Sequence, residues 1–205
     1  MYEKIFYEVK DYLRRHNADD DDRFTFRKRS GHIWRVYTWA KRLMEDCVEE
    51  INSEALLTAA LFHDIGYVKG VDDHASHSAD IFRDYAERKG YDKTQADFIE
   101  YLIRNHSDRE LLYSPDTPLE FILFKEADIL DEAGALGVVW FAMAAGSRGA
   151  EDYEGAYREY LSYARKILDN NPMKTAKARE IWERKQDFIR EFFAQLECDL
   201  AIDEK

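Results

Sequence analysis

Residues 53–66 read SEALLTAALFHDIG, an apolar run that ends in an adjacent histidine and aspartate, His63 and Asp64. Ser53 is a typical helix N-cap, and the leucines and alanines that follow recur at helical spacing. Because an unpaired buried charge is costly, His63 and Asp64 must be hydrogen-bonded, paired or bound to a metal. The alternative is an ordinary helix C-cap, with His63 on the last carbonyls and Asp64 accepting from loop amides.

Three other predicted helices each carry a polar side chain on an apolar face. His32 opens one stripe, His106 continues a second, and Asp128 extends a third. A bound metal would satisfy all three together with His63 and Asp64. Imidazoles mixed with carboxylates suit Mn, Fe, Co, Ni or Zn, whereas Mg and Ca sites are built from oxygen ligands.

The rest of the chain also predicts helices, notably over residues 75–88, 119–132, 153–168 and 175–196. The acidic run over residues 17–22 predicts a solvated loop. No window alternates with period two for long, and no repeat or linker divides the sequence. We therefore expect an all-α fold in a single domain over residues 1–205. Its core motifs lie in 27–137, and C-terminal helices in 150–198 pack on them.

Composition narrows the function classes. The chain has 205 residues, a formal net charge of −12, and only 9 glycines and 3 prolines, too few for a turn-rich β-fold. An acidic chain repels phosphodiester backbones, so we expect no non-specific nucleic-acid binding. Two lone cysteines suit a reducing compartment, and no apolar run reaches the ~20 residues of a membrane span. The N-terminus lacks a secretory signal pattern. These features predict a soluble, cytoplasmic protein that does not bind membranes.

The ligand candidates and their flanks resemble the HD-domain metal-dependent phosphohydrolase superfamily. HIWRV over 32–36 resembles its HxxRV opening, and ALFHDIG over 60–66 resembles its HD core. ADILDEAGALG over 127–137 is similar to a segment of small single-domain bacterial HD hydrolases, as is the closing helix that begins at 173. The resemblance covers most of residues 27–196.

This resemblance implies a helical core and a divalent transition metal, namely Mn, Ni, Co, Fe or Zn. The implied ligands are His32, His63, Asp64 and Asp128. The metal would lower the pKa of a bound water and so hydrolyse a nucleotide or another small phosphate ester or anhydride. Asp64 would orient the attacking water or bridge to a second ion.

The number of ions stays open. His74 and His106 lie in contexts that resemble family members with two metals, and Asp64 would then be the bridge. The segment over 127–137 resembles a branch that usually keeps only the four-ligand set. In that case the two histidines lie beside the site without binding metal, and His106 acts as a general acid or as a hydrogen-bond donor to the phosphate.

Four further residues are candidates for catalysis or substrate binding. Asp131 lies three residues after Asp128 on the same helix face, so we expect it to hold a ligand histidine or a substrate group. Arg29, Arg35 and Lys69 are the cationic candidates for the phosphate, although loop cations are more often merely solvated.

Two other functions are compatible with these residues. A six-ligand set also permits a di-iron oxygenase, and a structural metal would suit a non-catalytic ligand-binding domain. The oligomeric state is equally open. The tyrosines at 153, 157, 160 and 163 would pack either in the core of one chain or at the interface of a homodimer.

Overall fold

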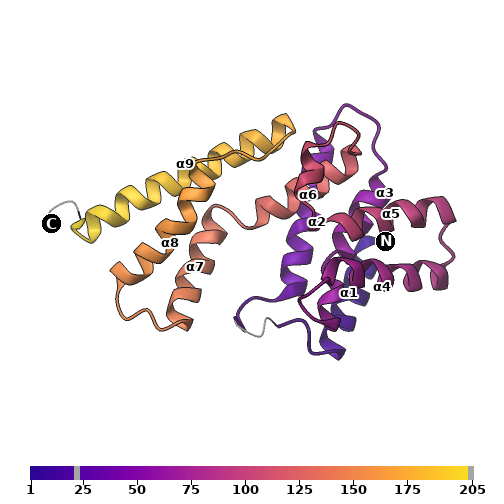
Figure 1. Ribbon diagram of the computed structural model, residues 1–205, viewed down its shortest axis with the longest axis horizontal. Helices are drawn as coiled ribbons and strands as arrows, with labels where there is room; N and C mark the ends of the chain where they lie inside the picture. Colours follow the sequence, from indigo (N-terminus) through magenta and orange to yellow (C-terminus); the bar gives the residue numbers. More distant parts are fainter. Residues whose placement is uncertain (21–23, 203–205) are drawn as a thin grey trace. The chain divides into compact units, whose positions relative to one another are not determined.

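The computed structural model describes residues 1–20 and 24–202, which form nine α-helices and two short 3-10 helices (Figure 1). The α-helices are α1 (Tyr2–Arg15), α2 (Arg29–Glu45), α3 (Ser53–Phe62), α4 (His74–Lys89), α5 (Lys93–Asn105), α6 (Leu119–Asp131), α7 (Ala135–Ser147), α8 (Tyr153–Leu168) and α9 (Ala176–Asp199). The 3-10 helices are η1 (Ile65–Lys69) and η2 (Glu110–Tyr113). These ranges contain no strand beyond an isolated bridge between Asp20 and Lys28, which confirms the all-α prediction.

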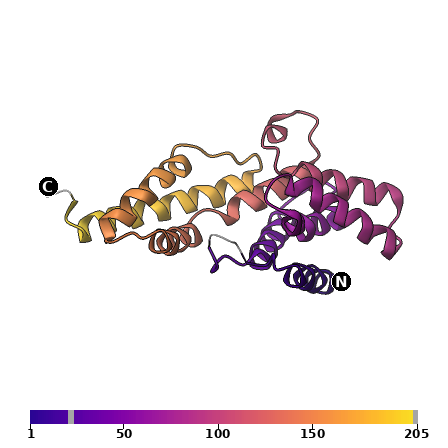
Figure 2. The ribbon, with the colours of Figure 1, turned by 60° about the horizontal axis from the view of Figure 1, so that its bottom comes forward.

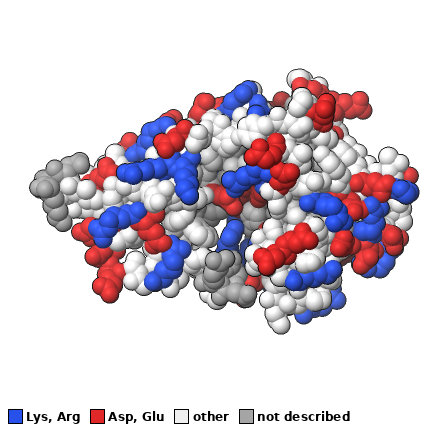
Figure 3. Space-filling model, in the orientation of Figure 1, with Lys and Arg blue, Asp and Glu red and all other residues white. Residues whose placement is uncertain are grey.

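The chain divides into two compact units, which we call the first unit (1–128) and the second unit (129–205). The expectation that helices in 150–198 pack on the core motifs stays a prediction. Within the described residues no single helix is long and apolar enough to cross a membrane, although α6 and α7 taken together have the length and composition. On the face drawn in Figure 3, cationic and anionic side chains of the described residues are interspersed, with no broad basic patch.

Helix α3 is the centre of the first unit. Every residue from Ala55 to Phe62 is buried, and α3 packs against α1, α2 and α5. Its N-cap is Asn52 and not Ser53, because the Asn52 side chain accepts a hydrogen bond from the amide of Ala55. Burying a helix on all faces brings the two residues that follow it, His63 and Asp64, into the core with it.

The start of α2 is fixed by Asp19, which is buried rather than solvated. Its carboxylate accepts a hydrogen bond from the amide of Ser30 at 2.8 Å, and its carbonyl accepts one from the amide of Arg29 at 2.7 Å. Asp19 does lie in a loop, but the prediction that this loop is solvated is wrong at Asp19, because a carboxylate is a favourable cap for a helix N-terminus. Residues 21 and 22 lie outside the described residues.

Helices η1 and α4 touch at Gly66. A Cβ atom there would lie 2.1 Å from the carbonyl oxygen of His74, and the amide of Gly66 donates to Oγ of Ser78 at 2.8 Å. Only glycine permits this approach of two backbones. The contact brings the segment after Asp64 against the first turn of α4.

In the second unit, α7, α8 and α9 pack on one another, as Figures 1 and 2 both show. Tyr160 stacks on Phe193 at 5.1 Å between ring centroids and also contacts Phe141. Gly134 is the N-cap of α7 and has a φ of +78°, a backbone conformation that favours glycine.

Candidate metal centre

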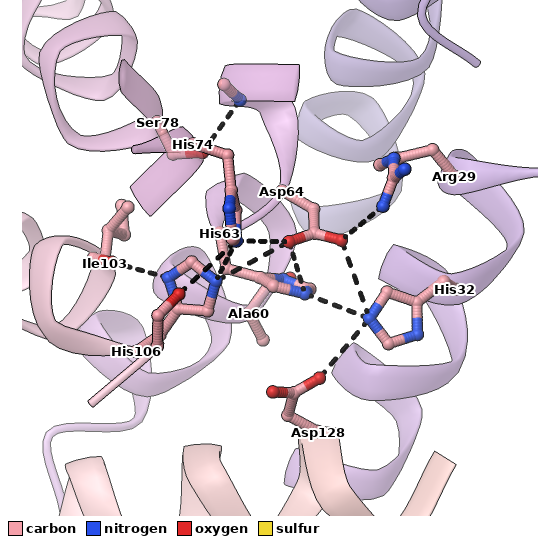
Figure 4. Close-up of polar contacts among 12 residues, drawn as sticks. Arg29, His32, Ala60, His63, Asp64, His74, Ser78, Ile103, His106 and Asp128 are labelled. Carbon is pink, nitrogen blue, oxygen red and sulfur yellow. Dashed lines mark hydrogen bonds and ion pairs between the residues drawn. The ribbon is translucent and has the colours of Figure 1, made fainter. Parts of the chain in front are cut away.

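Six side chains from five segments of the first unit converge at the buried end of α3 (Figure 4). His63 is the C-cap of α3, and Asp64 follows it at the start of η1. The others come from the first turn of α2 (His32), the first residue of α4 (His74), the C-cap of α5 (His106) and α6 (Asp128).

The six side chains form two donor sets, each with one ligand atom per residue and all atoms within 4.8 Å. His32, His63 and Asp128 make up one set; Asp64, His74 and His106 make up the other. Nε2 of His32 lies 3.2 Å from Nε2 of His63 and 3.3 Å from Oδ1 of Asp128. Nε2 of His74 lies 3.2 Å from Nε2 of His106.

Backbone carbonyls orient three of the imidazoles. Nδ1 of His63 lies 2.9 Å from the carbonyl of Ala60, and Nδ1 of His106 lies 2.7 Å from that of Ile103. Nδ1 of His74 lies 3.2 Å from the carbonyl of Val71. A carbonyl only accepts, so the hydrogen-bond network assigns the proton to Nδ1 and leaves a lone pair on each Nε2. The lone pairs on Nε2 of His74 and Nε2 of His106 lie 3.2 Å apart and repel, and a cation between them would remove that repulsion. Both donor sets mix imidazole and carboxylate donors, which suit a divalent transition metal.

Asp64 lies between the two sets. Its Oδ1 is 3.5 Å from Nε2 of His106 and 3.7 Å from that of His74. Its Oδ2 is 3.7 Å from Nε2 of His32 and accepts a hydrogen bond from Arg29 at 3.1 Å. Oδ1 also lies 3.5 Å from Nε2 of His63, so this one carboxylate borders histidines of both sets, as a bridging ligand would.

This geometry agrees with a match to the HD domain family model over residues 29–133. The chain belongs to the HD domain family. It is 30% identical over 176 residues to the uncharacterized protein YpgQ of Bacillus subtilis (strain 168), covering 83% of this chain and 85% of YpgQ.

Solved structures give the same fold. The crystal structure of B. subtilis YpgQ in complex with ADP is 27% identical to this HD-domain chain, with a TM-score of 0.68, and the match covers 97% of this chain and 94% of that one. An HD-superfamily hydrolase from Bacillus thuringiensis superposes with a TM-score of 0.74 at 22% identity, over 98% and 96% of the two chains. At that identity the likeness shows the fold alone.

The two carboxylates of the centre, Asp64 and Asp128, stay ionised. Burial alone would raise the pKa of Asp64, but the neighbouring His63, His106, His32 and Arg29 outweigh it and hold the pKa well below its usual value. Burial likewise opposes ionisation of Asp128, and Lys125 and His32 hold its pKa well below the usual value.

Burial favours the neutral forms of His63 and His74. Burial lowers the pKa of His63 to about 4 and also lowers that of His74. Neutral imidazoles and ionised carboxylates are the protonation states that bind metal ions.

The remaining predicted site residues are placed differently. Arg29 is buried on Asp64, whereas Arg35 is half-buried one turn after His32, and Lys69 is exposed at the end of η1. Asp131 is buried one turn after Asp128, in the second unit. Burial lowers the pKa of Lys185, and the neighbouring Asp131 opposes this effect.

Two residues beside the centre received no role from the sequence. Nζ of buried Lys125 donates to Oδ2 of Asp128 at 2.8 Å, so this carboxylate has one oxygen toward His32 and the other on an ammonium. The signal for Lys125 was its position three residues before Asp128 on the same helix face. The ring of Tyr67 stacks on that of His74, with 4.3 Å between centroids. No local pattern points to this contact.

Proposed function

We propose that this chain is a metal-dependent phosphohydrolase that acts on a nucleotide or another small phosphate ester or anhydride. The observation that carries the proposal is the pair of donor sets with Asp64 between them. Membership of the HD domain family supports it, and the ADP complex of YpgQ supports a nucleotide as the substrate class.

In this proposal the centre holds two divalent ions. His32, His63, Asp64 and Asp128 hold one ion, and Asp64, His74 and His106 hold the other. Bound divalent cations would supply Lewis acidity toward the phosphate oxygens and a hydroxide near neutral pH. Mn²⁺ is the ion we propose first, because it accepts imidazole and carboxylate ligands alike.

The chain's own residues orient these groups. Lys125 binds the outer oxygen of Asp128, so that the other oxygen turns toward His32, and Arg29 binds the oxygen of Asp64 that lies nearest His32. Asp131 is proposed to hold a ligand histidine or a substrate group. Arg35 and Lys69 are proposed to bind the anionic substrate.

A substrate panel on chelator-stripped protein tests the proposal. Nucleotides and phosphoesters are incubated with added Mn²⁺, Co²⁺, Ni²⁺ or Mg²⁺, and phosphate and pyrophosphate release are measured separately. We expect Mn²⁺, Co²⁺ or Ni²⁺ to restore release better than Mg²⁺, which prefers oxygen ligands. Two bound irons with a mixed-valent signal and no release would instead indicate an oxygenase. A tightly held metal with no turnover would indicate a ligand-binding domain.

The number of catalytic ions is read from His106→Ala. If both ions are needed, this variant loses activity as severely as His63→Ala. If one ion suffices, His106→Ala loses less activity than His63→Ala. His16→Ala is the matched control, because His16 is an exposed histidine at the end of α1.

A further inference from the structure

His74 is the least enclosed histidine of the centre. Its side chain is 20% exposed, against 1% for His63 and 3% for His106. Its backbone hydrogen bond, to the carbonyl of Val71, is also longer than those of His63 and His106. It follows Asp73, which has a φ of +56°, at the first position of α4. Backbone contacts alone therefore hold this imidazole less firmly than the others.

A flat ring covers one face of that imidazole. The ring of Tyr67 is stacked on it with an interplanar angle of 25°. The position of Tyr67 follows from the neighbouring Gly66, whose backbone lies directly against the first turn of α4. The ring that faces His74 is thus carried by a segment fixed to the same helix.

The other face of Tyr67 carries a cation. Cζ of Arg29 lies 3.4 Å from the centroid of the Tyr67 ring, and Nη1 of Arg29 donates to Oδ2 of Asp64. Arg29 is itself fixed by Asp19 at the start of α2. A guanidinium over an aromatic face is an attractive contact that strengthens when it is removed from water.

We propose that Arg29, Tyr67 and His74 form a stack that holds His74 in ligand geometry, with Tyr67 as the positioning residue for the second ion. The stack begins on Asp64 and ends on His74, two members of the same donor set. It therefore fixes the separation of two ligands that come from different segments. The inference rests on the two-ion centre proposed above, and it assigns the work to the ring of Tyr67 and not to its hydroxyl.

Titration of stripped protein with Mn²⁺ alone tests the stack without any substrate. Calorimetry gives the number of ions and their affinities, and electron paramagnetic resonance distinguishes a coupled Mn²⁺ pair from an isolated ion. Tyr67→Leu removes the ring, Tyr67→Phe keeps it, and Tyr153→Leu replaces a tyrosine that is 79% exposed in the second unit. Thermal unfolding without metal identifies any variant that fails to fold. If Tyr67→Leu fails to fold, Tyr67→His replaces it, and we expect its affinity for the second ion to lie between those of wild type and Tyr67→Leu.

We expect wild type, Tyr67→Phe and Tyr153→Leu to bind two ions with a coupled signal. Tyr67→Leu should keep one ion and bind the second about 10- to 100-fold more weakly, the usual effect of losing a group that orients a ligand. Unchanged affinity in Tyr67→Leu, an equal loss in Tyr67→Phe, or a single ion in wild type would each overturn the inference. Two ions with this pattern but no phosphate release would contradict the proposed function alone.

Discussion

Lys125 is a buried lysine whose ammonium lies 2.8 Å from Oδ2 of Asp128. Replacing it by methionine leaves that oxygen without its cation and frees the carboxylate to rotate. We expect Lys125→Met to weaken Mn²⁺ binding by about 10- to 100-fold, and Lys125→Arg to weaken it less. Calorimetric titration measures this. Lys93→Met is the control, since exposed Lys93 pairs with Asp97 away from the centre. Equal affinities in Lys125→Met and wild type would contradict this role.

Asp128 and Asp131 are a matched pair on α6, three residues apart. Because Oδ1 of Asp128 is directed at His32, Asp128→Asn should abolish binding of the ion held by the set of His32 and His63. Asp131→Asn should keep that ion and mainly lower turnover. Metal analysis after gel filtration separates the two variants. Loss of the ion in Asp131→Asn but not in Asp128→Asn would show that the ligand is the other aspartate.

The metal-free chain should become less stable as the pH falls from about 7 to 5. Burial lowers the pKa of His63 from 6.5 to about 4, so the unfolded chain takes up this proton first and is favoured as the pH drops below 6.5. The full contribution is about 3 kcal/mol. Urea unfolding in chelator at several pH values measures the trend. His63→Gln should flatten it and His16→Gln should not; equal midpoints at pH 7.5 and 5 for the wild type would refute the assignment.

At the scale of elements, the contact between η1 and α4 depends on the missing side chain of Gly66. Gly66→Ala places a methyl group 2.1 Å from a backbone oxygen, so the two elements must separate. We expect a loss of about 1–3 kcal/mol in the free energy of unfolding, together with weaker binding of the ion held by His74. Gly146→Ala, in the exposed last turn of α7 where a Cβ atom meets nothing, should instead stabilise by up to about 1 kcal/mol. Chemical denaturation compares them, and an unperturbed Gly66→Ala would contradict the close approach.

The elements themselves were largely predictable, because apolar periodicity and caps are local. The spacing predicted α8 with the observed bounds. The errors arose where a distant contact overrides local preference. Asn52, and not Ser53, is the N-cap of α3, and the backbone amide of Asn52 donates a hydrogen bond to Glu120, 68 positions away. Asp19 is buried because its carboxylate caps α2.

The candidate site divides in the same way. All six clustered side chains were named from the sequence, because each lies in a motif or at the end of an apolar stripe. Their role as ligands stays a prediction. The stack of Arg29, Tyr67 and His74 joins three segments through side-chain faces, and no spacing in one sequence encodes which faces meet.

For the whole molecule, charge is the main constraint on a phosphate substrate. A chain with a net charge of −12 attracts an anion only where local charge is reversed, and divalent ions at the centre would reverse it. Because the ions bind only the folded centre, adding Mn²⁺ to stripped protein should also raise its melting temperature.

Phosphate release by one preparation before and after metal removal is the most direct test of the claim that this cluster is a hydrolytic metal centre. We predict that EDTA-stripped protein releases no phosphate from a substrate found in the panel, and that Mn²⁺ restores release as the ions are bound. His63→Ala should stay inactive with Mn²⁺ present, because it removes a ligand fixed by the buried end of α3. Release that continues undiminished in the stripped protein, or in His63→Ala, would contradict the account.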